Sequence, residues 1–152
     1  MRLFFPLMAL LIALPAHAGP GQVRALGGNT YITDTFDAWD GWACSATSGN
    51  GWGLSSGYAI LLTNSTGGVL TKTVTSRAGV YRIKASVANT YTGVTCTFSI
   101  DEGTPVSCVA PTANGVDATF EQPITAGTHT LTVNASTGDN NVRIAEISFP
   151  SP

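Results

Sequence analysis

Charged residues are scarce in this sequence. Lys and Arg together number 7, and Asp and Glu number 9, among 152 residues, so that 11% of the chain is charged. The few basic residues form no cluster. A protein that follows a phosphate backbone needs several cations on one surface. The composition therefore argues against a nucleic-acid partner, and Thr, Ser, Asn and Gly carry the polarity instead, as expected for a solvated β-surface with many turns.

Histidine is nearly absent. The chain has His17 and His129 only, and His129 lies in an alternating apolar pattern that predicts a packed strand residue. A serine or cysteine nucleophile thus lacks a histidine base, and zinc lacks ligands. Two carboxylates can cleave a glycosidic bond, but Asp101 and Glu102 are interpreted as a hairpin turn, and nothing in the sequence links another pair. We therefore expect no enzyme and no catalytic residues.

Long hydrophobic runs are missing except at the start of the chain. Arg2 is followed by an apolar run over residues 3–14 and by a small-residue site at Ala16-His17-Ala18. A membrane-spanning helix needs roughly twenty apolar residues, so this shorter run indicates a secretory signal peptide. We expect residues 1–18 to be removed. Residues 19–152 then form a single domain, secreted to the extracellular space or the periplasm, with no membrane span.

Helical periodicity is also lacking in the mature sequence, whereas apolar and polar residues alternate repeatedly. Alternation with a period of two predicts half-buried antiparallel strands. The candidate strands are Gln22 to Leu26, Tyr31 to Phe36, Tyr58 to Thr63, Val69 to Val74, Val80 to Val87, Val94 to Ile100, Thr104 to Val109, Asp117 to Ile124, Thr128 to Asn134 and Val142 to Phe149. Many short strands separated by turn residues predict an all-β antiparallel sandwich or jelly roll.

Two segments depart from simple alternation. In the last strand, the apolar residues are even-numbered at Val142 and Ile144 but odd-numbered at Ile147 and Phe149. This switch predicts a β-bulge near Ala145 and Glu146. Residues 37–56 are rich in Trp, Gly and Ser and show no sustained alternation. We expect this segment to be a long loop or an irregular edge, where binding residues tend to lie.

The three cysteines suit an oxidising compartment. If Ile100 faces Thr104 across a three-residue hairpin loop, Cys96 faces Cys108, and the apolar faces of both strands agree with this register. Gly103 is then expected to supply the positive φ of the loop. We predict a disulfide between Cys96 and Cys108. Cys44 is left as a buried thiol, as a partner in another pairing, or as a site of intermolecular bonding.

Several segments resemble the galactose-binding-like superfamily of carbohydrate-binding modules. Their order and spacing are similar to the pattern of families 4 and 9, and AGTHTLTVNA is equally similar to families 6 and 35. The segments are DTFDAWDGW at Asp34 to Trp42, YAILLTNSTGGVLTKTV at Tyr58 to Val74, RAGVYRIKASV at Arg77 to Val87, AGTHTLTVNA at Ala126 to Ala135 and IAEISF at Ile144 to Phe149. The resemblance implies a galactose-binding-like β-sandwich that binds a glycan or polysaccharide.

Sugar recognition needs an apolar face beside hydrogen-bonding side chains. The aromatic candidates in predicted loops are Trp39, Trp52 and Tyr91, whereas Trp42 occupies a packed position in the family and is expected in the core. The polar ligand-binding candidates are Asn89, Asp139 and Asn141.

The resemblance also implies a structural calcium ion. In the similar families, calcium joins the N-terminal acidic motif to the last strand. In this chain the corresponding residues are Asp37 and Glu146, with Asp34 nearby. The family's paired aspartates are replaced here by Ala145 and Glu146.

The sequence therefore favours a secreted, non-catalytic module that binds a glycan through loop aromatics. The alternative is a structural or adhesive sandwich that assembles on a cell surface, an appendage or a virion. Such a protein would self-associate through Cys44 or through strand edges. The absence of an attached catalytic domain favours this alternative, whereas the loop aromatics favour the first.

Overall fold

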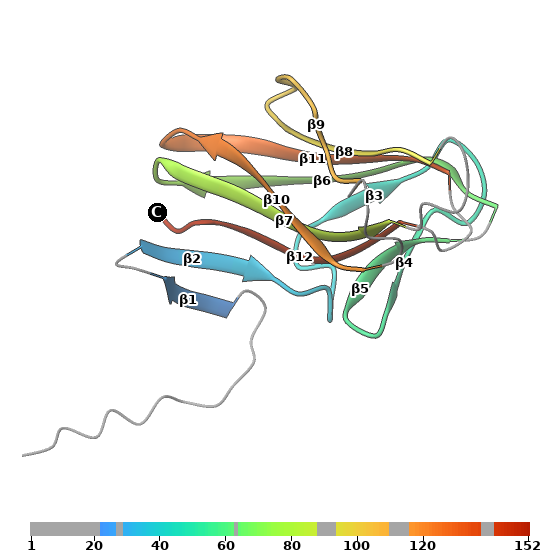
Figure 1. The fold of residues 1–152 in the computed structure, drawn as a ribbon, viewed down its shortest axis with the longest axis horizontal. Coiled ribbons are helices and arrows are strands. Elements are labelled where there is room, and N and C mark those ends of the chain that lie inside the picture. The colour runs from blue at the N-terminus through green and yellow to red at the C-terminus, as the bar shows by residue number, and fades with distance from the viewer. Residues whose placement is uncertain (1–21, 27–28, 63, 88–93, 110–115, 138–141) are drawn as a thin grey trace, which may run out of the picture.

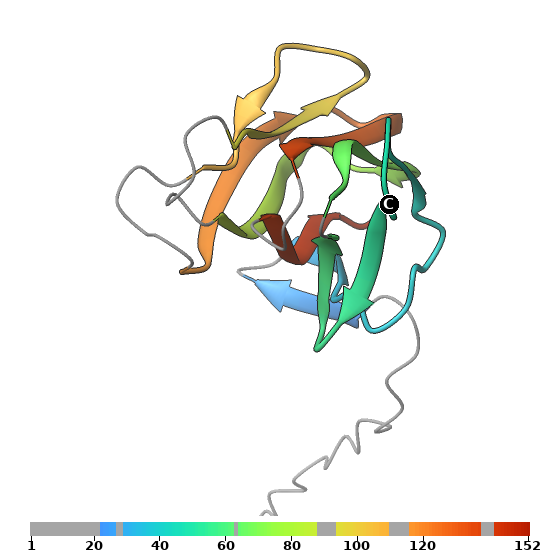
Figure 2. The same cartoon turned by 90° about the vertical axis from the view of Figure 1, so that its right-hand side faces the viewer.

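The computed structural model describes residues 22–26, 29–62, 64–87, 94–109, 116–137 and 142–152. Within them, the chain forms two antiparallel β-sheets stacked face to face (Figure 1; Figure 2). This arrangement confirms the predicted all-β sandwich. No helix long and apolar enough to cross a membrane occurs among the described residues.

Most strands of sheet A lie in the lower part of Figure 1. Its strands are β1 (Gln22–Leu26), β2 (Asn29–Asp34), β4 (Trp52–Ser55), β5 (Tyr58–Leu61), β7 (Gly79–Val87), β10 (Ala118–Ile124) and β12 (Val142–Pro150). Strand β12 lies at the centre. It pairs with β7 along one side, and with β5 and β2 in succession along the other.

Sheet B forms the upper layer. Its strands, in spatial order, are β3 (Ala43–Ser45), β6 (Thr66–Ser76), β11 (Gly127–Thr137), β8 (Cys96–Ile100) and β9 (Val106–Ser107). Strands β6 and β11 form the longest pairing of the sheet, from Gly127 opposite Ser76 to Thr137 opposite Thr66.

The core fills the space between the inner faces of the sheets. Alternate residues of each strand are buried there, including Tyr81 and Ile83 of β7 and Leu131 and Val133 of β11. The predicted bulge is confirmed, because the register of β12 with β7 shifts between Ile144 and Glu146. The shift follows from burial. It lets both the even-numbered and the odd-numbered apolar residues of β12 reach the core, namely Val142, Ile144, Ile147 and Phe149.

The hairpin between β8 and β9 has the predicted register, and Cys96 and Cys108 form a disulfide. The turn itself differs from the prediction. Positive φ occurs at Asp101 (50°) and Glu102 (59°), whereas Gly103 is not among the residues with positive φ. The Gly103 N–H donates to the Ile100 carbonyl at 2.8 Å. Two consecutive residues with a left-handed backbone conformation form a tight turn, and the twist of this turn matches the twist of the two flanking strands.

The segment 37–56 is more ordered than a long loop. It contributes β3 to the edge of sheet B and β4 to the edge of sheet A. Pairing with β5 turns the Trp52 side chain inward, where it is 6% exposed. A Cβ atom at Gly68 would lie 2.8 Å from Trp52 Nε1, so the absence of a side chain at Gly68 makes room for this ring. The expectation of Trp52 in an exposed loop is therefore wrong.

The burial of Trp52 predicts a stability effect. Replacing Trp52 with Ala should cost about 3–5 kcal/mol of unfolding free energy, because it leaves a cavity between the sheets. Trp39→Ala is the control, since Trp39 is only partly buried and contacts Phe36 edge-on. Urea unfolding of both variants measures the difference. A Trp52→Ala midpoint equal to that of Trp39→Ala would contradict the burial.

Candidate functional site

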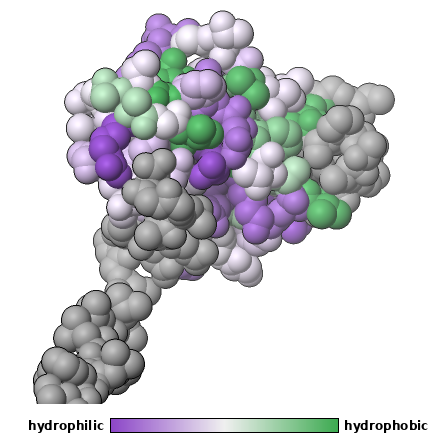
Figure 3. Space-filling view, turned by 60° about the vertical axis from the view of Figure 1, so that its left-hand side comes forward, coloured by the Kyte–Doolittle hydropathy of each residue, from purple (hydrophilic) through white to green (hydrophobic). Residues whose placement is uncertain are grey.

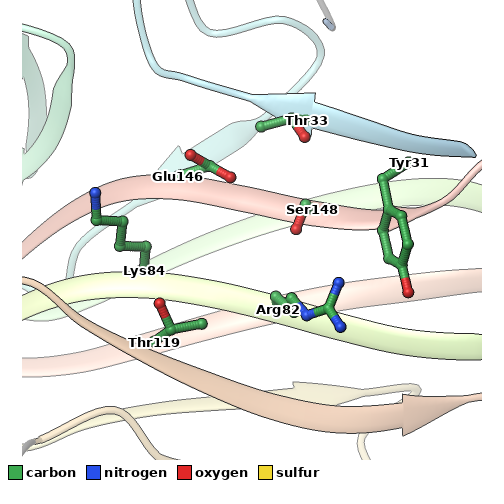
Figure 4. A pocket seen from close by; sticks show the side chains of 7 residues that line it. All are labelled: Tyr31, Thr33, Arg82, Lys84, Thr119, Glu146 and Ser148. Atoms are coloured by element: carbon green, nitrogen blue, oxygen red, sulfur yellow. The ribbon is translucent and has the colours of Figure 1, made fainter. Parts of the chain in front are cut away.

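A polar pocket of about 200 Å³ opens on the outer face of sheet A (Figure 4). Its side chains come from four neighbouring strands. They are Tyr31 and Thr33 of β2, Glu146 and Ser148 of β12, Arg82 and Lys84 of β7, and Thr119 of β10. The outward direction of each side chain follows from the alternation of side chains along a strand, since its neighbours in the chain point toward the core. The bulge in β12 aligns Glu146 and Ser148 with this outer face.

The strand registers arrange these residues in two rows across the sheet. In one row, Ser148 lies opposite Thr33 on one side and opposite Arg82 on the other. In the next row, Lys84 lies opposite Glu146 and Thr119. Residues in such positions are side-chain neighbours. The pocket therefore places hydroxyl groups beside a guanidinium, an ammonium and a carboxylate.

Arg82 is held in place at one end of the pocket. Its Nε donates to Glu121 Oε1 at 2.6 Å, and its guanidinium carbon lies 4.8 Å from the centroid of the Tyr31 ring. The hydrogen bond to Glu121 raises the pKa of Arg82 above its ordinary value. Tyr31 is buried beneath this cation. The guanidinium is therefore a fixed, charged donor rather than a freely moving side chain.

Lys84 and Glu146 supply the remaining charges. Lys84 Nζ lies 3.6 Å from Asp117 Oδ2, and the lysine side chain is 45% exposed. The same Asp117 oxygen accepts a hydrogen bond from Tyr58 at 3.2 Å. Because Lys84 is exposed and only loosely paired, its ammonium can reach a ligand at the mouth of the pocket.

Two hydroxyl groups at the pocket have no protein partner among the described residues. Thr33 is 2% exposed and Ser148 is 6% exposed as whole residues, but their hydroxyl oxygens are not among the buried polar atoms that lack a partner. The two oxygens are therefore open to the pocket. Water or a ligand hydroxyl in the pocket can form hydrogen bonds with both.

Several sequence-predicted site residues lie elsewhere. Trp52 is in the core, and Trp39 packs partly buried against it. Trp42 is buried, as expected. The other four ligand candidates lie outside the described residues: Asn89, Tyr91, Asp139 and Asn141.

Sequence reasoning named Glu146 only as a possible calcium ligand and missed the other pocket residues. The polar side of the strand containing Arg82 and Lys84 was recognised, but an alternating polar face is typical of simple solvation. Nothing local shows that residues of β2, β10 and β12 join it. Two buried hydroxyl-bearing residues on an otherwise solvated face are the distinguishing signal, and burial is visible only in the fold.

The proposed calcium ligands do not form one site. Among the described residues, no three acidic, histidine or cysteine side chains are grouped so as to hold a metal ion. Asp34 is 2% exposed and already paired, since Oδ2 accepts from Lys72 Nζ at 2.7 Å and from Trp42 Nε1 at 2.9 Å. Asp37, by contrast, accepts from Thr35 at the surface. An ion held jointly by Asp34, Asp37 and Glu146 therefore does not fit this arrangement.

Solved structures of similar fold include family 35 carbohydrate-binding modules. The module from Clostridium thermocellum is 15% identical, with a TM-score of 0.44, over 88% of this chain and 100% of that one. The module from Paenibacillus barcinonensis is 18% identical, with a TM-score of 0.46, over 76% of this chain and 94% of that one.

A longer enzyme also contains a similar portion. A Podospora anserina β-(1,4)-mannanase with a family 35 module is 17% identical, with a TM-score of 0.47, over 80% of this chain. The chain spans only 28% of that enzyme's length, and 29% of an exo-β-1,3-galactanase from Phanerochaete chrysosporium. No protein-family model matches the sequence, and no curated protein matches it.

The buried ion pair predicts a strong stability effect. Lys72→Met should cost about 3–5 kcal/mol, because it leaves the Asp34 carboxylate buried without its ammonium partner. The matched control is Lys84→Met, which breaks an exposed pair and should cost less than about 1 kcal/mol. Urea unfolding at neutral pH distinguishes them. Equal losses in the two variants would show that the Asp34 pair is no more important than a surface pair.

Proposed function

We propose that this protein is a secreted, non-catalytic carbohydrate-binding module, and that the pocket on sheet A binds one sugar unit of a glycan or polysaccharide. The observation that carries the proposal is the pocket itself, in which the hydroxyl groups of Thr33 and Ser148 lie between charged donors and a carboxylate. Secretion is inferred from the signal-like segment 1–18 and is supported by the disulfide.

The chemistry of the pocket suits a polyol. Each sugar hydroxyl donates one hydrogen bond and accepts others, so a site needs both kinds of group in close proximity. Arg82 and Lys84 donate, Glu146 accepts, and Thr33 and Ser148 can do either. A volume of about 200 Å³ is below the range of drug-sized sites and suits roughly one sugar ring.

The pocket is less suited to glycoside cleavage. Hydrolysis needs two carboxyl groups on either side of the scissile bond. Among the described residues that line the pocket, Glu146 is the only carboxylate. Binding without cleavage is therefore the function that this geometry favours. The loop candidates Asn89, Tyr91, Asp139 and Asn141 remain a sequence-based proposal for further ligand contacts.

A glycan array of the secreted protein, followed by affinity electrophoresis on the retained polysaccharide, tests the proposal. Thr33→Val and Ser148→Ala each remove a hydroxyl while keeping the side-chain volume similar, and should weaken retention about tenfold through loss of a hydrogen bond. The matched control is Thr73→Val, an exposed threonine of sheet B. Retention of both pocket variants equal to that of Thr73→Val would place the sugar site elsewhere.

A second candidate function is assembly into a surface structure. Cys44 is exposed, lies on the edge strand β3 and forms no disulfide within the chain. Hydrophobic association has less support, since the exposed large hydrophobic residues among those described are Leu54 and Val116. On the face seen in Figure 3, hydrophobic residues are scattered among polar ones. Assembly would therefore depend on a covalent bond or on strand-edge pairing.

Size-exclusion chromatography with and without reductant tests this second function. If Cys44 drives assembly, the oxidised protein should elute as a dimer or larger species, and both reduction and Cys44→Ser should return it to a monomer. Cys44 is exposed, so the substitution should change stability by no more than about 0.5 kcal/mol. A monomeric oxidised protein would argue against the covalent route.

A further inference from the structure

A groove of about 560 Å³ crosses the outer face of sheet B, on the opposite side of the sandwich from the pocket of sheet A. Its floor consists of residues from three adjacent strands, and the turn between β8 and β9 forms one end. The floor residues are Thr71 of β6, Thr130, Thr132 and Asn134 of β11, and Ser99 of β8. The end of the groove includes Asp101, Glu102 and Pro105.

The registers place three hydroxyl groups in one row across this floor. Thr132 lies opposite Thr71 on β6 and opposite Ser99 on β8. Neighbouring strands are about 4.8 Å apart, so the three hydroxyl-bearing residues form an evenly spaced row that can contact several hydroxyl groups of an extended saccharide. Asn134, one alternation further along β11, adds an amide that can donate and accept.

Ser99 is recessed in the floor of the groove. The residue is only 5% exposed and lines the groove, and its side chain forms no hydrogen bond with another described residue. Its hydroxyl oxygen is not among the buried polar atoms that lack a partner, so the little surface that Ser99 exposes includes a hydroxyl that a ligand in the groove can reach.

The groove differs from the pocket of sheet A in its charge. Its described lining includes two carboxylates, Asp101 and Glu102, and no Lys or Arg. Asp101 is fixed: Oδ2 accepts from His129 Nδ1 at 2.6 Å, and Oδ1 accepts from the Thr130 amide at 2.7 Å. These hydrogen bonds, the one from His129 first, lower the pKa of Asp101, so its carboxylate stays ionised at neutral pH. Glu102 is exposed and forms no ion pair with a described residue.

We propose that this groove is a second binding site, and that it takes a polyhydroxylated ligand carrying a cationic group, namely a saccharide with free amino-sugar units. The hydroxyl row and Asn134 bind the sugar hydroxyls, and Glu102 binds the ammonium group beside the fixed charge of Asp101. This site goes beyond the pocket of sheet A and does not depend on it, because the two lie on opposite outer faces of the sandwich.

The test uses the secreted protein and two tetrasaccharides, β-1,4-linked glucosamine with free amines and its fully N-acetylated form. Both are titrated by calorimetry at a pH at which the free amines are protonated. The charged tetramer should bind at least about tenfold more tightly than the acetylated one, since only the former forms a charge-assisted hydrogen bond with a carboxylate. Binding of the charged tetramer should weaken as salt is added.

Variants separate the groove from general attraction to an acidic protein. Glu102→Gln should weaken binding of the charged tetramer about tenfold, and Ser99→Ala should weaken it severalfold. Asp37→Asn, which removes an exposed carboxylate on another segment, is the matched control and should have no effect. Thermal melting confirms that every variant is folded. Thr33→Val should leave this binding unchanged, which distinguishes the groove from the pocket of sheet A.

Three results would overturn the proposal. Equal binding of the two tetramers would show that the ammonium is not recognised. A loss in Asp37→Asn equal to that in Glu102→Gln would show nonspecific attraction to acidic surface. No binding of the charged tetramer to the folded protein would show that the groove does not take this class of ligand.

Discussion

Both the core and the pocket of sheet A depend on the β-bulge in β12, where the buried positions switch from even-numbered to odd-numbered residues. This strand pairs with β7, β5 and β2, so its side-chain directions must suit three neighbours. Without the shift between Ile144 and Glu146, either Val142 and Ile144 or Ile147 and Phe149 would face solvent. Burial of each of these four apolar side chains contributes roughly 1.5–3 kcal/mol to the stability of the fold. The same shift directs Glu146 and Ser148 to the outer face, where they line the pocket.

The buried network around Asp34 connects the two sheets. Asp34 ends β2 in sheet A, whereas Lys72 lies in β6 of sheet B, and their charged groups meet at 2.7 Å. Trp42 adds its indole N–H to the same carboxylate oxygen, and the lysine ammonium lies 5.8 Å from the centroid of the Trp42 ring. Two charges removed from water are costly unless both are satisfied. The network therefore specifies how the segment after β2 packs against sheet B.

The outer faces of the two sheets share one feature and differ in another. Each has recessed residues whose hydroxyl groups have no protein partner among the described residues and are open to the surface, Thr33 and Ser148 on sheet A and Ser99 on sheet B. The pocket of sheet A has two cations beside one carboxylate, whereas the described lining of the groove has carboxylates only. Because the core lies between the sheets, ligands on the two faces would not touch. Hydroxyl chemistry is thus common to both faces, and charge distinguishes them.

The sequence by itself determined every strand except β3 and β4, most of the inward-facing residues, the bulge and the hairpin register that joins Cys96 to Cys108. These features depend on alternation and on turns, which act between residues close along the chain. Only the tertiary structure decided that Trp52 is buried, since its ring needs the space beside Gly68. It also decided that Asp34 pairs with Lys72 and that Thr33, Arg82 and Ser148 lie side by side. Each of these contacts joins strands far apart in the chain, and periodicity shows which face a residue occupies but not which residues meet it there.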